Sequence, residues 1–518
     1  MSEQIRRVVI VGGGSAGWLA AGVIAADHQV PRVPGLEVTL VESPAVSPIG
    51  VGEGTWPSMR DTLRRIGVSE TDFIRECDAA FKQGSRFVDW TEGGGEHYYH
   101  PFSLPQGYGE ANLVSPWLRG HAAAPFAELV SCQPLICEHG RAPKQVTTPE
   151  YAAVANYAYH LDAGKFGPFL QRHCTARLGV RHVLDHVTRI EASDNGDIAA
   201  IVTGAHGRIA GDLFVDCTGF SSLLLGQHYG VPLTSVQPQL FNDSALAVQV
   251  PYAAVDAPIA SHTISTARAA GWIWDIGLQG RRGVGHVYSS AHMPDDEAEL
   301  ILREYVAAGT DARTAAALAP RKLSFRPGYR ATQWHRNCVA VGLAAGFVEP
   351  LEASALALVE FSAAMISEQL PATRALMDTV AARYNDAFRY RWERALEFLK
   401  LHYLLSRRGD SPYWIEHRAA ATVPPRLAEL LDLWRYQPPS RYDFPRIEEI
   451  FPAASYQYVL YGMGFRPEPG TRPEPAQNAA LAQRCFAEAA ALGRSMLAAL
   501  PTNRALLNHL QSYRLQRI

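Results

Sequence analysis

Several features that would quickly assign a protein to a class are missing from this sequence. No apolar run reaches the roughly 18 residues that a membrane-spanning helix needs. The seven cysteines include no close Cys-x-x-Cys pair, and no His, Cys and Asp residues have metal-ligand spacing. There is also no internal repeat and no low-complexity segment. We therefore predict a globular protein with reduced thiols, without a disulfide framework and without a metal site.

The sequence also lacks a clear excess of positive or negative charge. Lysine and arginine together number 48, aspartate and glutamate number 51, and the net charge is -3. A chain this close to neutral lacks the basic surface that binds nucleic acid or an anionic membrane, so neither is predicted as a partner. The stretch after Arg6 and Arg7 imitates a signal peptide, but its glycines suit a strand, a turn and a helix better. We expect a cytoplasmic protein.

The length of 518 residues exceeds what one hydrophobic core usually supports. Segments with strand-like and helix-like patterns alternate up to about residue 370. Beyond that point apolar residues recur at helical spacing, and proline-rich breaks at 424–425, 438–439 and 467–475 separate the helices. The predicted fold class is therefore α/β, followed by a mostly helical C-terminal part.

The N-terminal part of the chain contains a nucleotide-binding pattern. A buried strand at residues 8–11 is followed by a glycine turn and the start of a helix, which comprise Gly12, Gly14, Ser15, Ala16 and Gly17. The glycines allow a tight turn and close approach to a pyrophosphate, and the helix N-terminus offers N–H donors and the positive end of its dipole. A second strand ends at Glu42, 25 residues past Gly17, where a carboxylate would accept hydrogen bonds from ribose hydroxyls.

Two further segments favour FAD over NAD as the nucleotide. In GDLFVDCTGF (211–220) a buried strand ends at Asp216 and Cys-Thr-Gly follows, which resembles the second nucleotide motif of FAD-dependent monooxygenases. The segment 337–361 again joins a strand, a glycine turn at Gly342 and a helix, like the segment that places a helix N-terminus near a flavin ring. Three such blocks in one chain indicate FAD.

These patterns together define the predicted domains. Residues 1–370 form an FAD-binding, flavin-monooxygenase-like module built on a Rossmann-type βαβ unit. Segments at about 91–150 and 231–325 are inserted into this module on the substrate side. Residues 371–518 form a helical C-terminal substrate domain.

Five motifs occur in order along the chain. They are GGGSAGW (12–18), GVGEGTWPSM (50–59), FKQGSRFVDW (81–90), GWIWDIGL (271–278) and GFVEPLEASAL (346–356). With YHPF (99–102), they resemble the flavin-dependent tryptophan halogenase family. The lysine of the third motif and the W-x-W-x-I pattern of the fourth are quite specific, because ordinary flavin hydroxylases lack both.

The resemblance implies an FADH2-dependent halogenase. In that family reduced FAD and oxygen give a flavin hydroperoxide, halide attacks its distal oxygen, and the resulting hypohalous acid passes along an internal passage to an electron-rich aromatic ring. Chloride or bromide and O2 are then co-substrates. Since the sequence contains no separate NAD(P)H site, a partner NAD(P)H-dependent flavin reductase is expected to supply the reduced flavin. The resemblance also implies a homodimer.

Two residues take catalytic roles by this resemblance. Lys82 coincides with the family's catalytic lysine, which hydrogen-bonds hypohalous acid or carries the halogen beside the substrate. Its spacing alone suggests something simpler, a lysine at the end of a helix that begins at Ser69 and stops at Gly84. Glu352 matches the family's second glutamate and becomes the partner of Lys82, while Glu349 is interpreted as structural.

Two departures from the family pattern bear on the halide and the strand. Ala353-Ser354-Ala355 replaces Ser-Thr-Gly, so the halide is expected mainly at the backbone N–H groups of Ser354 and Ala355. An alanine at 355 restricts a backbone that glycine would leave free, and a larger halide such as bromide is favoured. Gly277 replaces proline in the fourth motif and loosens the end of that strand.

The resemblance also assigns the substrate side. His100 and Phe102 match residues that sandwich the substrate ring, and flat aromatic faces suit such stacking. Trp272 and Trp274 keep the substrate away from the flavin, on a strand predicted to bury one face. The residues comparable to the family's amino-acid clamp, Tyr442, Glu448, Glu449 and Tyr456, do not align with it convincingly. Indole or a simple indole derivative is therefore favoured, with tryptophan, phenols, pyrroles and peptide-borne tryptophan as further candidates.

Two alternatives remain open at this stage. One is a single-component flavin-dependent aromatic hydroxylase that uses NAD(P)H directly. The other is a non-catalytic protein that binds flavin or an aromatic ligand. Lys82 argues against both, and the W-x-W-x-I strand argues against the first.

Overall fold

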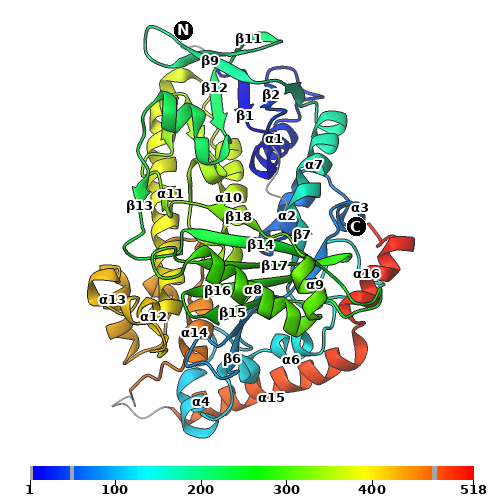
Figure 1. Ribbon diagram of the computed structural model, residues 1–518, viewed down its shortest axis with the longest axis vertical. Helices are drawn as coiled ribbons and strands as arrows, with labels where there is room; N and C mark the ends of the chain where they lie inside the picture. Colours follow the sequence, from blue (N-terminus) through cyan, green and yellow to red (C-terminus); the bar gives the residue numbers. More distant parts are fainter. Residues whose placement is uncertain (1–3, 47–51, 469–474, 518) are drawn as a thin grey trace. The chain divides into compact units, whose positions relative to one another are not determined.

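The computed structural model of the protein describes residues 4–46, 52–468 and 475–517, so Gly50 and Val51 of the second motif lie outside the described residues (Figure 1). The chain divides into two compact units. The first comprises residues 1–79, 161–236 and 325–392, and the second comprises 80–160, 237–324 and 393–518. Each unit is thus built from three separate stretches of the sequence, whereas the domain boundary suggested at residue 370 stays a prediction.

The first unit is built on a six-stranded sheet with the order β20-β21-β12-β1-β2-β8. These strands are Trp334–His335, Cys338–Ala340, Leu213–Asp216, Arg7–Val11, Glu37–Glu42 and Arg181–Leu184. β1 pairs in parallel with both β2 and β12, as expected of short apolar runs that are buried on both faces. The strands predicted to end near Gly12, at Glu42 and at Asp216 are confirmed, and with them the α/β class.

Helices of the first unit pack beside this sheet. α1 (Ser15–Asp27) contacts α7 (Ala163–Arg177) and α10 (Ser354–Glu368). α1 is buried along most of its length because its residues are apolar or small on every face. The unit also contains α2 (Ser58–Arg65), α3 (Glu70–Glu76) and two small antiparallel sheets, β9-β10-β11 (Val187–Ala192, Ile198–Thr203, Gly207–Ala210) and β13-β19-β22 (Thr234–Ser235, Gly328–Tyr329, Gly346–Phe347).

The second unit is built on a seven-stranded sheet with the order β18-β14-β17-β16-β15-β5-β6. Its strands are Arg321–Ser324, Ser244–Pro251, Arg281–Tyr288, Gly271–Gly277, Thr263–Arg268, Gly84–Val88 and His97–Pro101. All neighbours pair antiparallel except β15 and β5. α8 (Asp295–Gly309) covers part of this sheet, and β4 (Ala80–Lys82) pairs with β7 (Ala158–Asp162).

The C-terminal part is helical, as its spacing predicts. It comprises α11 (Arg374–Leu404), α12 (Pro412–Glu416), α13 (Pro425–Trp434), α14 (Ala453–Gly462), α15 (Ala476–Ala499) and α16 (Asn503–Ser512). Two of the predicted breaks coincide with helix starts, because Pro425 occupies the first turn of α13 and Pro475 caps α15.

The prediction of a helix that ends beside Lys82 is wrong. Ser69 does cap a helix, since its side chain accepts a hydrogen bond from the Asp72 amide at 3.3 Å. That helix, α3, ends at Glu76, and Asp78 then adopts a left-handed conformation with φ 52°. The following apolar residues pair with β7, so Lys82 is the last residue of a strand. Gly84 lets β5 approach β6, because a Cβ there would lie 2.5 Å from the His100 carbonyl oxygen.

Two absences concern only the residues that the structure describes. No helix among them is both long and apolar enough to cross a bilayer. No group of three or more His, Cys, Asp and Glu side chains among them is arranged to hold a metal ion.

Candidate active site

The turn between β1 and α1 forms a cradle at the N-terminus of α1. A Cβ on Gly17 would lie 1.9 Å from the Gly12 carbonyl oxygen, so the turn closes tightly on itself there. Gly14 is the N-cap residue of α1, and among residues 4–46, 52–468 and 475–517 nothing lies within 4 Å of a Cβ placed there and no side chain caps the helix. The first N–H groups of α1 therefore remain for a ligand, and this arrangement fits the pyrophosphate of a dinucleotide such as FAD.

Two carboxylates border this cradle. Glu42, at the end of β2, lies close above Gly13, and its Oε2 is 3.0 Å from His182 Nε2. Asp216 is fully buried and accepts hydrogen bonds from the Leu224 and Leu225 amides at 2.9 and 2.8 Å, as well as from Thr218. The Asp216 carboxylate therefore holds the turn after β12 in place. Any role in cofactor binding would act through that turn.

Gly342 begins a short 3₁₀ helix, η3 (Gly342–Ala344), with φ 68°. A Cβ on Gly342 would lie 2.9 Å from the Cβ of Ala16. The glycine turn of the third block therefore packs directly on the first turn of α1. The sequence segments that predicted a flavin site thus converge in one unit of the protein.

Replacing Gly14 by alanine is expected to weaken FAD binding about 10- to 100-fold without unfolding the protein, because the new methyl group meets no atom of the described residues but occupies the cradle. The matched variant Gly17→Ala is expected to lower the unfolding temperature, since its methyl group collides with the backbone. FAD titration by fluorescence and thermal unfolding measure the two effects. Undiminished FAD affinity in Gly14→Ala would contradict the cradle.

The loop before α10 carries the predicted glutamate and halide residues. Glu352 and Ala353 both adopt left-handed conformations, with φ 63° and 56°. Ala355 lies inside α10 and is exposed, so the helix accommodates an alanine at this position, and the effect of the missing glycine on the halide stays a prediction. Ser354 is buried, and no side chain in the part of the chain that the structure describes caps the N-terminus of α10. The turn therefore presents amide groups that an anion could use.

Trp56 fixes this loop from the segment that precedes α2. Its indole Nε1 donates a hydrogen bond of 2.7 Å to the Glu352 carbonyl oxygen. The Glu352 side chain is 8% exposed. The backbone of Glu352 is left-handed and is held by the Trp56 hydrogen bond. The direction in which its side chain leaves the loop is therefore set by this backbone conformation.

A buried carboxylate that the sequence did not indicate connects α2 with α10. Glu360 is 3% exposed and accepts hydrogen bonds from the hydroxyls of Ser58, at 3.1 Å, and Thr62. Burial raises the pKa of Glu360 from 4.5 to about 8. Glu53, in the second motif, also has its pKa raised by burial, to about 7. Only their buried environments, which the sequence does not reveal, distinguish these two glutamates.

The contribution of Glu360 to the stability of the protein is expected to fall as pH rises through the range from about 5 to 8. In that range the folded state keeps the Glu360 proton while the unfolded state has lost it, which costs up to about 1.4 kcal/mol per pH unit. Glu360→Gln removes this titration, so the stability of the variant relative to the parent should increase up to pH 8 and level off above it. Denaturant unfolding at five pH values measures the difference. A gap that does not change with pH would refute the assignment.

Lys82 lies in the second unit, at the end of β4. It is 1% exposed, and its ammonium stands 5.3 Å from the centre of the Phe102 ring. Lys82 and His160 are diagonal neighbours on one face of the β4–β7 ladder. Ala158 lies directly opposite Lys82, and Ala80 lies directly opposite His160. Burial, with the charge of Lys82, lowers the pKa of His160 well below its usual range, so this imidazole is neutral. The buried Lys82 ammonium therefore lies beside the Phe102 ring and near the neutral His160.

His100 and Phe102 lie on and just after β6. His100 is buried, and its ring is 5.7 Å from Phe398 and 6.2 Å from Tyr458. Phe398 stacks on Phe451 with ring centres 3.8 Å apart. The structure thus brings Lys82 and the two predicted substrate residues together in one unit, among aromatic side chains from α11 and α14.

Trp272 and Trp274 are on β16, whose seven residues are all buried. The prediction that one face of this strand is buried was therefore incomplete. Trp274 packs on Gly285, and Trp272 is 6.2 Å from Trp90. The opposite face carries Asp275, which contacts α8 through the Tyr305 hydroxyl at 3.1 Å. Because α8 covers that face, both faces of β16 are buried, whereas the sequence suggested alternating buried and exposed residues.

The predicted site residues are distributed over both units. The cradle, Glu352, Ser354 and Ala355 belong to the first unit, whereas Lys82 and the aromatic residues belong to the second. The sequence model of one protein family, the tryptophan halogenases, matches residues 7–478 of this chain. The match extends over both units.

The chain belongs to the tryptophan halogenase family.

Individual relatives agree with this assignment. The tryptophan 6-halogenase SttH of Streptomyces toxytricini is 37% identical over 492 residues, which cover 91% of each chain. A crystal structure of tryptophan halogenase from Shewanella frigidimarina has a TM-score of 0.96 and 49% identity, and the match covers 100% of this chain and 99% of that one. BrvH, a flavin-dependent halogenase from Brevundimonas sp. BAL3, has a TM-score of 0.85 and 33% identity, over 98% and 99% of the two chains.

The protein is therefore an enzyme, a flavin-dependent halogenase. The matches support this function over the hydroxylase and the non-catalytic alternatives. The halogenases of the family depend on flavin, and the cradle at α1 fits such a cofactor.

Proposed function

We propose that this halogenase acts on indole or a simple indole derivative, with tryptophan as the second candidate. The buried Lys82 ammonium next to Phe102 carries the proposal, because it places a polarising cation beside a surface for a flat ring. Tryptophan is the substrate that the names of several relatives print. A substrate amino acid would also need polar partners for its charged backbone.

Two of the residues comparable to an amino-acid clamp, Tyr442 and Glu448, are too exposed to suit that task. The side chain of Tyr442 is 81% exposed and Glu448 is also exposed, while Glu449 is half-buried and accepts a hydrogen bond from the Arg446 amide. Tyr456 is fully buried among Phe398, Trp434 and other rings. These positions support an uncharged indole over free tryptophan.

The cofactor is FAD in its reduced form, held by the first turn of α1, Glu42 and the turns at Thr218 and Gly342. Reduced flavin and oxygen, when bound, supply the oxidising equivalents that convert chloride or bromide to hypohalous acid. The uncapped amides at Ser354 and Ala355 bind the halide. The reduced flavin comes from a separate NAD(P)H-dependent reductase.

Lys82 acts on the oxidant. Its ammonium donates a hydrogen bond to the oxygen of hypohalous acid, which makes the halogen more electrophilic and directs it toward the ring. His100 and Phe102 hold that ring by stacking. Glu352 takes the proton that the ring releases when the carbon–halogen bond has formed and passes it to the hydroxide displaced from the hypohalous acid, so hypohalous acid and arene yield the haloarene and water. Trp272 and Trp274 keep the substrate from the flavin.

A coupled reaction tests this proposal. The enzyme is mixed with a flavin reductase, NADH, FAD, oxygen and either chloride or bromide, and the products from indole, tryptophan and phenol are analysed by mass spectrometry. Halogen isotope patterns with indole are expected, with a weaker signal from tryptophan. Preferred turnover of tryptophan would replace the indole assignment, and hydroxylated products would refute the chemistry.

A further inference from the structure

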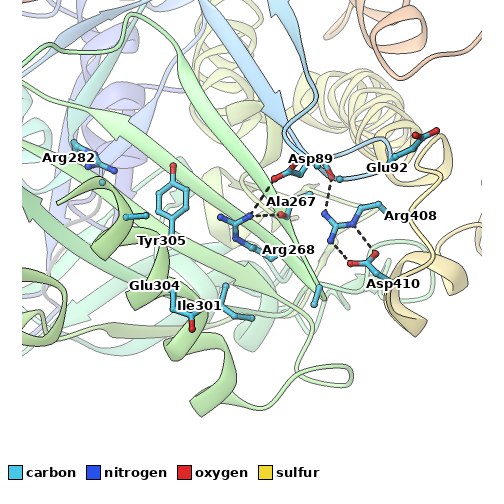
Figure 2. A pocket seen from close by; sticks show the side chains of 15 residues that line it. Asp89, Glu92, Ala267, Arg268, Arg282, Ile301, Glu304, Tyr305, Arg408 and Asp410 are labelled. Atoms are coloured by element: carbon cyan, nitrogen blue, oxygen red, sulfur yellow. Dashed lines mark hydrogen bonds and ion pairs between the residues drawn. The ribbon is translucent and has the colours of Figure 1, made fainter. Parts of the chain in front are cut away.

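A cavity lies in the unit that contains Lys82 but is formed by residues without a role in the proposed reaction. Its volume is about 960 Å³, within the range of sites for small molecules. It is bounded by the C-terminal half of α8, the turn after β15 and the loop that follows β5 (Figure 2). Its charged residues and tyrosine are Asp89, Glu92, Arg268, Arg282, Glu304, Tyr305, Arg408 and Asp410.

This cavity opens on the opposite face of the sheet from the two tryptophans. Along β16 the side chains alternate, so Asp275 points away from Trp274 and toward α8. The Asp275 carboxylate accepts hydrogen bonds from Arg282, with Nε at 3.0 Å, and from the Tyr305 hydroxyl at 3.1 Å. One wall of the cavity is therefore fixed from within the sheet.

The cavity is also remote from the catalytic lysine. Asp89 directly follows β5, whereas Gly84, at the other end of that strand, is two residues after Lys82. Five strand residues separate the two sites, about 16 Å at 3.3 Å per residue. A ligand bound beside Asp89 would not reach the Lys82 ammonium.

Two of the three arginines that line the cavity are already paired with carboxylates. Arg282 is paired with Asp275, and Arg408 is paired with Asp410 at 2.5 Å and donates to the Asp89 carbonyl at 2.9 Å. Both guanidinium groups are thereby fixed as walls of the cavity. They leave little charge for a ligand.

Arg268 differs from these two arginines. Its Nη1 donates to the Ala267 carbonyl at 3.1 Å and lies 3.8 Å from the Asp89 carboxylate, beyond hydrogen-bond distance. Its Nε and Nη2 make no hydrogen bond within the described residues. The group stacks over Tyr305 at 5.4 Å and projects between Tyr305 and Asp89 (Figure 2). Burial lowers the pKa of Arg268, which means that its neighbours do not fully compensate for the water that the guanidinium has lost.

The rest of the lining favours a positive charge at a second point. Glu304 is exposed on α8, and the last turns of that helix, with Ala308 and Gly309, line the cavity. The C-terminal end of a helix carries partial negative charge, so it attracts a cation. A polyanion such as phosphate would meet this negative charge and that of Asp89. A ligand with one negative and one positive group matches both points.

We propose that this cavity is a second binding site, which takes an α-amino acid as its zwitterion. The ligand carboxylate binds the open Nε and Nη2 edge of Arg268. The ammonium group lies toward Glu304 and the end of α8, and the side chain packs on Tyr305 and Ile301. This site goes beyond the proposed halogenation and does not require it.

Calorimetric titration of the full-length protein tests the proposal with three probes of one shape. L-phenylalanine carries both charges, 2-phenylethylamine lacks the carboxylate and 3-phenylpropanoate lacks the ammonium group. L-phenylalanine is expected to bind with a dissociation constant at or below about 1 mM, and each partial probe about tenfold more weakly. Arg268→Ala should weaken L-phenylalanine about tenfold, and Arg268→Lys less. Arg313→Ala, an exposed arginine on α9 (Ala312–Ala317) outside the cavity, is the matched control.

Hydrogen exchange distinguishes this cavity from the active site. With L-phenylalanine present, peptides covering residues 89–95 and 300–309 should gain protection in the parent protein and in Arg313→Ala. Protection confined to residues 98–104, equal binding by Arg268→Ala, equal binding of all three probes, or no binding at millimolar concentration would each overturn the proposal. None of these readouts uses halogenation, so a wrong substrate assignment would leave them unaffected.

Discussion

Replacing Lys82 by methionine is expected to reduce halogenation on the order of a hundred- to ten-thousand-fold, the range typical of lost catalytic groups. Methionine is long and apolar, so it fits the position that Lys82 occupies with 1% exposure and next to Phe102. What the variant loses is the ammonium that polarises the oxidant. The measurement is haloindole formed per minute in the reductase-coupled reaction.

Two controls make this result specific to Lys82. Lys322→Met removes an exposed lysine of the same unit, paired with Asp295, and should keep the parent rate. Oxygen consumption by Lys82→Met should continue, because the flavin cradle is untouched, and a hypohalous acid trap in solution should then capture the oxidant. Halogenation at the parent rate, or loss of flavin turnover together with halogenation, would contradict the proposed role.

The sequence was most informative where local patterns decide the structure. The strand at residues 8–11, the glycine turn and the strand ending at Glu42 follow from burial and from steric requirements within about 40 residues. Asp216 was also placed at the end of a strand, although its carboxylate turned out to bind the backbone of its own turn. The family motifs added the order of the segments and the halogenase assignment.

The sequence was least informative where distant segments decide the structure. Lys82 was expected at a helix end because nothing local shows that residues 80–82 pair with 158–160. The left-handed turn at Glu352 and Ala353 depends partly on Trp56, almost 300 residues earlier. The cavity around Arg268 combines residues from 89 to 410, so no single motif marks it.

The position of Glu352 leads to a second large effect. Glu352→Gln keeps the size of the side chain and the carbonyl that accepts the Trp56 hydrogen bond, but it removes the negative charge. If this carboxylate takes the ring proton, kcat should fall about a hundredfold or more while the KM for indole and the affinity for FAD change little. Initial rates over a range of indole and halide concentrations separate these parameters.

Glu349→Gln is the matched control for this prediction, because Glu349 is also buried and lies on the same loop. It should alter the free energy of unfolding more than kcat, since Glu349 is interpreted as structural. Equal loss of kcat in both variants would mean that the loop, and not the Glu352 carboxylate, carries the effect.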